Sequence, residues 1–137
     1  MIGKLDEALD FQANALKLRG YRQQLLASNL ANADTPNYKA VDFNFAESMQ
    51  AATSAQGGQV TPAPLQTTSP LHLRGNASAP PGVRVQYRSA LQPSIDGNSV
   101  DLDTERGQFA DNAVRYEAAV RFLNDQIRDL ATAMKGE

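Results

Sequence analysis

The sequence lacks cysteine and tryptophan altogether, and its 137 residues include a single histidine, His72. Without cysteine the chain can form neither a disulfide nor a thiolate metal site, and it has no cysteine nucleophile. A lone histidine has no partner ligand with which to hold a transition metal, and no glycine-rich phosphate loop occurs. We therefore expect no metal, no cofactor and no catalytic residues, and the sequence argues against an enzyme.

An excess of charge and long apolar runs are also missing. The formal net charge is −2, so no overall basic field attracts nucleic acid or an anionic membrane surface. No stretch approaches the roughly 20 apolar residues of a membrane span. Asp6, Glu7 and Asp10 interrupt the apolar core that a cleavable signal peptide requires. We expect a protein made in the cytoplasm, with no direct membrane span and no cleaved signal peptide.

The strongest pattern that is present lies in the last third of the chain. Eight apolar residues follow one another at alternating steps of four and three, which is the a/d pattern of a helix with a continuous apolar seam. These residues, here called the C-terminal seam, are Phe109, Ala113, Tyr116, Val120, Leu123, Ile127, Leu130 and Met134. Between them lie opposite charges at helical spacing, namely Asp111 with Arg115, Glu117 with Arg121, and Asp125 with Arg128.

The start and the end of this C-terminal helix, predicted for residues 101–137, are marked by local signals. Negative charge in the first turn suits the positive end of the helix dipole, and either Asp101 or Asp103 is the predicted N-cap. Gly136 lies just past the last seam residue, where a left-handed C-cap is common. The residues that we assign to the helix start are Asn98, Val100, Asp101 and Glu105.

A first long helix is predicted for residues 1–34, with a weaker apolar face. Its packing residues fall close to one side at helical steps and are Leu5, Leu9, Leu16 and Leu30. Leu18, Leu25 and Leu26 widen this face in the second half. Gly20 within the helix indicates either a close helix–helix approach or a tolerated imperfection.

The segment that ends the first helix combines asparagines with a turn. The residues that we single out there are Asn29, Asn32, Thr35, Pro36, Asn37 and Tyr38. Pro36 cannot continue a helix, and Thr-Pro-Asn-Tyr predicts a turn in which Asn37 takes a positive φ. The amides of Asn29 and Asn32 suit either of two roles, which are to close the helix end or to bond to a neighbouring molecule.

Residues 35–100 form a Pro/Gly/Ser-rich middle with little to bury. Val41, Phe43 and Phe45 alternate with polar residues, and residues 83–88 alternate again, which predicts a small two-stranded β element. Between them, residues 48–82 carry one charge and are expected to be mobile unless a partner orders them.

The predicted fold class is mainly α, with the long N- and C-terminal helices forming an antiparallel, coiled-coil-like pair in one structural unit. Two helices of about 45 Å and a poorly packed middle make a marginal monomer. We therefore expect the seams to pack against copies of the chain or related chains, and whether they pair within or between subunits stays open.

Two motifs give the chain a family resemblance. Its first motif resembles the Ala-Asn-x-x-Thr-Pro-Gly-Tyr signature of bacterial flagellar axial proteins (rod, hook and hook-associated), and it reads Leu26-Ala27-Ser28-Asn29-Leu30-Ala31-Asn32-Ala33-Asp34-Thr35-Pro36-Asn37-Tyr38. Asn37 replaces the glycine and still suits a positive φ. The second motif is similar to the C-terminal region of short proximal rod proteins of type B, and it comprises residues 96–105 with Phe109-Ala110-Asp111-Asn112 and Tyr116.

The resemblance implies a structural subunit of the proximal rod of the bacterial flagellar basal body. Such a subunit polymerises through its terminal helices, transmits torque and lines the export channel for flagellum-dependent motility. It implies other rod subunits, the rod-to-membrane-ring adaptor and the flagellar type III export apparatus as partners, with the motif after the first helix making inter-subunit contacts. The implied location is the periplasm-spanning rod. The alternatives are another short axial protein, or a soluble helical adaptor or export chaperone of a type III secretion system.

Overall fold

The structure of the protein, a computed structural model, describes residues 2–54, 79–89 and 94–136. His72 and most of the 48–82 stretch lie outside the described residues. The elements in chain order are α1 (Ile2–Ala31), β1 (Val41–Asp42), α2 (Phe45–Ser54), β2 (Gln86–Tyr87) and α3 (Leu102–Lys135).

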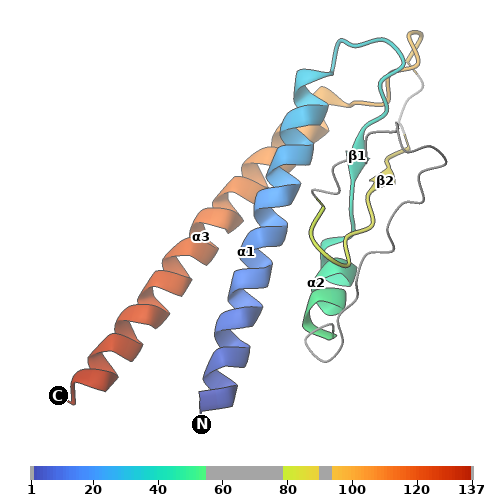
Figure 1. Ribbon diagram of the computed structural model, residues 1–137. Coiled ribbons are helices and arrows are strands. Elements are labelled where there is room, and N and C mark those ends of the chain that lie inside the picture. Colours follow the sequence, from blue (N-terminus) through green and yellow to red (C-terminus); the bar gives the residue numbers. More distant parts are fainter. Residues whose placement is uncertain (1, 55–78, 90–93, 137) are drawn as a thin grey trace, which may run out of the picture.

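The two long helices run antiparallel and pack against each other (Figure 1). They lie closest where α1 ends and α3 begins, and their axes separate toward the two termini of the chain (Figure 1). The predicted fold class, mainly α with a pair of long terminal helices and a small β element, is confirmed. Neither these helices nor α2 is long and apolar enough to cross a membrane, within the part of the chain that is described.

The signals at both ends of α3 act as predicted. The side chain of Asp101 accepts hydrogen bonds from the backbone N–H groups of Asp103 and Thr104, both at 3.1 Å, and so caps the helix. Gly136 ends the helix with a φ of 72°. The expected ion pairs Asp111–Arg115 and Glu117–Arg121 form, whereas Asp125 and Arg128 do not pair in the structure as described.

The middle of the chain is partly different from the prediction. β1 and β2 pair antiparallel, with Val41 opposite Tyr87, so the predicted β element is confirmed. Phe45, however, was predicted to continue the strand and instead begins α2. The reason is local, because the side chain of Asn44 accepts a hydrogen bond from the N–H of Glu47 at 3.2 Å and caps a new helix.

Helix α1 is covered from two sides, by α3 and by α2 with the small sheet. The contact of α1 with α2 and the small sheet forms the core, where Leu18 packs with Phe43 and Met49. Leu18 and Leu26 are the buried apolar residues of α1, at 2% and 0% exposure. The predicted packing residues Leu5, Leu9, Leu16 and Leu30 are only half-buried. The sequence pattern misplaced the centre of the buried face because it anticipated one neighbour, while the helix has two.

Candidate functional site

The asparagine that follows the core residues of α1 is fully buried and joins three elements. Asn29 donates from Nδ2 to the carbonyl of Val41 at 2.8 Å and accepts from the N–H of Val41 at 3.0 Å. Its amide thus satisfies both backbone groups of one residue of β1, as a neighbouring strand would. The same Nδ2 reaches Oε2 of Glu105 on α3 at 3.2 Å. Instead of closing the end of α1, the Asn29 side chain bonds to β1 and α3 of the same chain.

A charged cluster lies beside Asn29 and connects α1, both strands and α3. We define the charged cluster as Arg22, Asp42, Arg88, Glu105 and Gln108. Arg22 donates to both carboxylate oxygens of Asp42, at 3.0 and 2.8 Å. Arg88 bridges Asp42 and Glu105, and Oε1 of Gln108 accepts from Arg22 and Arg88 at 3.2 and 2.8 Å. Glu105 is only 1% exposed, whereas the side chains of Asp42, Arg22 and Arg88 are 14%, 22% and 25% exposed, and every charge of the cluster has an opposite partner.

The electrostatics of the charged cluster favour its ionised form. Burial raises the pKa of Asp42, but the hydrogen bonds from Arg22 and from the N–H of Phe43 and the charges of Arg22 and Arg88 outweigh it. The net pKa of Asp42 lies below its ordinary value, so this carboxylate is charged at neutral pH. The arrangement binds the chain to itself and presents no unpaired acid or base for chemistry.

The predicted turn after α1 is confirmed. Asn37 has a φ of 61°, and the N–H of Tyr38 donates to the carbonyl of Thr35 at 3.3 Å. Asn32 donates to the carbonyl of Ser28 at 2.8 Å and accepts from the hydroxyl of Thr35 at 3.2 Å, so it closes the helix end. Of this motif, Thr35, Pro36 and Asn37 are exposed at one tip of the molecule.

The end of α1 is closed from far along the chain by Asn98. The amide Nδ2 of Asn98 donates to the carbonyls of Asn32, Ala33 and Thr35 at 3.0, 2.7 and 3.0 Å. These carbonyls lie just past the helix, where backbone acceptors lack helical partners. The sequence assigned Asn98 only to the start of the C-terminal helix. Its closure of α1 was missed because no local pattern reports a contact over more than sixty residues.

Backbone hydrogen bonds reinforce this contact, which we call the end joint (residues 32–40 against residues 96–99). The N–H of Asn37 donates to the carbonyl of Asp96 at 2.9 Å, and the N–H of Ser99 donates to the carbonyl of Tyr38 at 3.0 Å. The hydroxyl of Ser99 accepts from the N–H of Ala40 at 2.8 Å. The end joint therefore fixes where α3 starts relative to where α1 ends.

The C-terminal seam changes character along α3. Phe109, Ala113, Val120, Leu123 and Leu130 are half-buried, and none of the eight seam residues is fully buried. The other three seam residues grow more exposed toward the C-terminus, with Tyr116 at 39%, Ile127 at 50% and Met134 at 87%.

Two polar residues are the fully buried positions of α3. They are Glu105 and Asn112, and Asn112 donates to the carbonyl of Arg19 at 3.0 Å and to Oε1 of Gln23 at 2.7 Å. The first half of α3 is thus held to α1 by specific hydrogen bonds. The position of Gly20 fits this contact, because a Cβ added there would lie 3.6 Å from the Tyr116 ring, an ordinary van der Waals distance. The glycine marks the helix contact, although an alanine would also fit.

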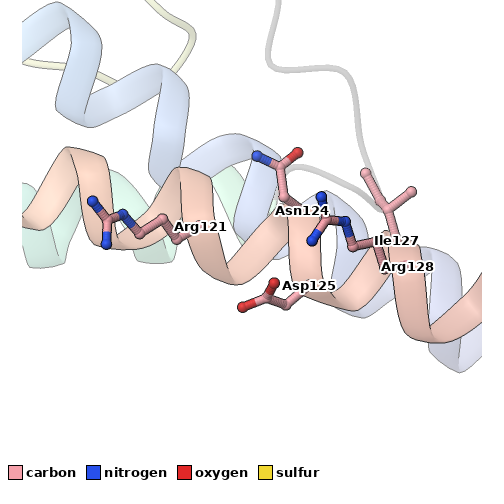
Figure 2. Close-up of a pocket in the computed structure, with 5 residues that line it drawn as sticks. All are labelled: Arg121, Asn124, Asp125, Ile127 and Arg128. Carbon is pink, nitrogen blue, oxygen red and sulfur yellow. The ribbon is translucent and has the colours of Figure 1, made fainter.

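The distal half of α3 (residues 121–135) carries a hollow that is built by this helix alone. It is lined by Arg121, Asn124, Asp125, Ile127 and Arg128, which Figure 2 shows as sticks along one stretch of α3. Asp125 projects to the other side of the helix from Asn124 and Ile127 (Figure 2). No three potential metal ligands come together among the residues that the structure describes.

Comparison with known proteins places this architecture among flagellar components. The sequence profile of the family described as "Flagella basal body rod protein" matches residues 9–39, which comprise most of α1 and the turn motif. Two near full-length relatives are described as flagellar basal body rod protein FlgB. The relative from Escherichia coli (strain K12) is 43% identical over 135 residues, which are 98% of each chain. The relative from Salmonella typhimurium is 41% identical over 136 residues, which are 99% of each chain.

A third similar protein comes from another organism. The flagellar basal body rod protein FlgB of Cereibacter sphaeroides is 41% identical over 137 residues and covers the whole of both chains. The similarity therefore includes the end joint, the charged cluster and all of α3, and it extends well beyond the N-terminal motif.

Proposed function

This chain belongs to the FlgB family of flagellar basal body rod proteins, and we propose that it builds the rod by packing its two terminal helices against those of neighbouring subunits. It is a structural subunit of the proximal rod in the flagellar basal body, and it assembles there with other rod subunits. The observation that carries the proposed packing is the incompletely covered seam in the distal half of α3, where Leu123 and Leu130 are half-buried while Ile127 and Met134 are 50% and 87% exposed. A row of exposed apolar residues on one helix face is typical of a surface that a partner covers.

In this proposal the two halves of α3 have different tasks. The first half is tied to α1 by Asn112, Glu105 and the end joint, so it belongs to the fold of the single subunit. The distal half continues the same seam beyond this contact and packs on neighbouring rod subunits. A continuous helix that is clamped at one end also provides a stiff element for the transmission of torque, and a ring of such helices lines the export channel.

The exposed tip of the turn motif is the second surface that we assign to inter-subunit contacts. Thr35, Pro36 and Asn37 are exposed, while Asn29 is buried and Asn32 bonds within its own turn. Only the tip is therefore accessible to a neighbour. We propose that Asn29, Asn32 and Tyr38 position this tip from within the subunit, because Tyr38 contacts Asn29 at 3.3 Å.

Further partners and the route to the rod follow from the family. We propose that the subunit contacts the adaptor between the rod and the membrane ring, and that it reaches the periplasm through the flagellar type III export apparatus without a cleaved signal peptide. The charged cluster fits a structural role inside the subunit, because its charges are paired with each other.

The exchange Leu123→Asp tests the packing role of the distal half. Leu123 is half-buried in the single subunit, so a charge there is tolerated by the monomer but not in a helix–helix interface, where an unpaired carboxylate costs several kcal/mol. We expect normal expression, no assembled rod and no motility, measured by immunoblotting, electron microscopy of basal bodies and swimming assays. The adjacent exchange Asn124→Asp, at an exposed position off the seam, is the matched control and should leave motility intact.

Motile cells that carry Leu123→Asp would contradict the role of the seam. A deletion strain with complete rods would go further and contradict the assignment of this chain to the rod. The two results are distinguishable, because the first changes one surface and the second removes the subunit.

A further inference from the structure

Helix α3 carries a second apolar surface that its contact with α1 does not use. Val114, Ala118 and Phe122 are spaced by four residues, so their side chains form one row along the helix, here called the ridge. Val114 is 69% exposed, Phe122 is 57% exposed, and Ala118 is exposed as well. Each residue advances about 100° around an α-helix, so Ala118 lies nearly opposite Tyr116 and Val120 of the seam. The ridge therefore faces away from α1.

Four of the charges that flank the ridge are neutralised in pairs within the helix, whereas Asp125, one turn beyond Phe122, forms no ion pair in the described part of the chain. Asp111 pairs with Arg115 at 2.8 Å, and Glu117 pairs with Arg121 at 2.6 Å. Arg115 of the first pair comes one residue after Val114, whereas Glu117 and Arg121 of the second pair come one residue before Ala118 and Phe122. The two pairs therefore lie on opposite sides of the ridge. A surface that covers the ridge does not have to supply counter-charges. The matching surface should accordingly be apolar and uncharged.

Such a surface exists on the same chain, where α1 meets α3. A groove of about 480 Å³ lies there, and its lining residues carry no charge. Its walls include Gly20, Gln24 and Ala27 from α1 and Phe109, Ala113 and Tyr116 from α3. The glycine and the alanines leave room between the helices, and the two aromatic rings supply apolar surface. The exposed row of an α-helix packs into a groove of this kind.

We propose that the ridge of one subunit docks into the groove between α1 and α3 of a second copy of this chain. The two surfaces match in their absence of charge, and they lie on different faces of the subunit. A contact between two different patches of identical chains does not form a symmetric dimer; it generates a ring if the rotation closes and an open helical series if it does not. This geometry is the one required of a subunit that polymerises, and the inference rests on the rod function proposed above.

The ridge contact is small, which defines its part in assembly. Three side chains bury much less surface than the roughly 800 Å² per partner of a stable protein–protein interface. The contact alone does not hold two free subunits together at low concentration. It acts together with the distal half of α3, and it sets which subunits become neighbours once the rod is being built.

Cysteine cross-linking within the rod tests this docking cleanly, because the natural chain has no cysteine. Cells that lack the natural gene co-express two single-cysteine versions, Ala118→Cys on the ridge and Ala27→Cys in the groove. Basal bodies are isolated and oxidised, and the products are separated under non-reducing conditions. We expect a disulfide-linked pair of the two versions as the dominant product. Ala46→Cys, at an exposed alanine on α2, replaces the ridge version in the control and should give only background cross-linking.

The outcomes separate the docking from the rod function. Basal bodies that contain both versions but no cross-linked pair above the Ala46→Cys background would overturn the docking and leave the rod assignment intact. A cross-link from Ala118→Cys to a different polypeptide would overturn the assignment of a second copy as the partner. Basal bodies of wild-type cells that lack the natural chain would contradict the rod assignment itself.

Discussion

Replacing Glu105 by alanine is expected to lower the free energy of unfolding by about 3 kcal/mol. Glu105 is 1% exposed, and its removal leaves the Arg88 guanidinium and the Asn29 amide each without one partner. The loss of one partner of a buried pair typically costs about 3–5 kcal/mol. We expect the lower end of this range because Arg88 keeps its contact with Asp42 and with Gln108. Urea unfolding followed by circular dichroism measures the change.

The matched control for Glu105 is another glutamate of the same helix. Glu117 pairs with Arg121 at 2.6 Å, but both side chains are largely exposed. Its replacement by alanine should change the free energy of unfolding by at most about 1 kcal/mol, because exposed ion pairs contribute little. Equal effects of the two exchanges would mean that the charged cluster does not hold α1, the sheet and α3 together.

Replacing Asn98 by alanine is expected to lower the free energy of unfolding by about 2–4 kcal/mol. The exchange removes a single amide that donates to three carbonyls at the end of α1. It also removes the acceptor of the Val100 N–H, which lies 2.8 Å from Oδ1 of Asn98. Buried groups that lose their hydrogen bonds cost about 1–3 kcal/mol each, and part of this set is accessible to water. Denaturant unfolding again measures the loss.

The exchange Asn98→Asp distinguishes hydrogen bonding from packing at the end joint. Aspartate has nearly the same size and still accepts from Val100, but it cannot donate to the carbonyls of α1. We therefore expect Asn98→Asp to destabilise the protein at least as much as Asn98→Ala. Near-normal stability of the aspartate variant would show that Asn98 acts by filling space, and the proposed closure of α1 would be wrong.

The parts of the fold that the sequence predicts are those with local causes. Asp101 caps α3 through neighbours two and three residues away, and Gly136 ends the same helix through its own backbone conformation. The turn at Asn37 follows from Pro36 and from the tolerance of asparagine for a positive φ. Each of these features depends on a few consecutive residues, so a single sequence is sufficient to predict it.

The contacts that organise the site join residues that are far apart in the sequence, so local sequence patterns do not predict them. The bond from Asn98 to Asn32 spans 66 residues, and the bond from Asn29 to Glu105 spans 76 residues. From the sequence, Asn29 was equally suited to closing its own helix end or to bonding with a neighbour, and Asn98 was assigned only to the start of the C-terminal helix. The periodicity of the seam likewise predicts which side of α3 is apolar. It does not predict that α1 covers the first half better than the distal half.

We expect the distal half of α3, which is only partly covered in the single subunit, to become fully packed after assembly, and amide hydrogen exchange measures this directly. In the free subunit we expect slow exchange for residues 106–120 of α3, which α1 and the charged cluster hold, and fast exchange for residues 121–135. In isolated rods residues 121–135 should become as protected as the first half. Slow exchange of both halves in the free subunit, or fast exchange of residues 121–135 within the rod, would contradict the account.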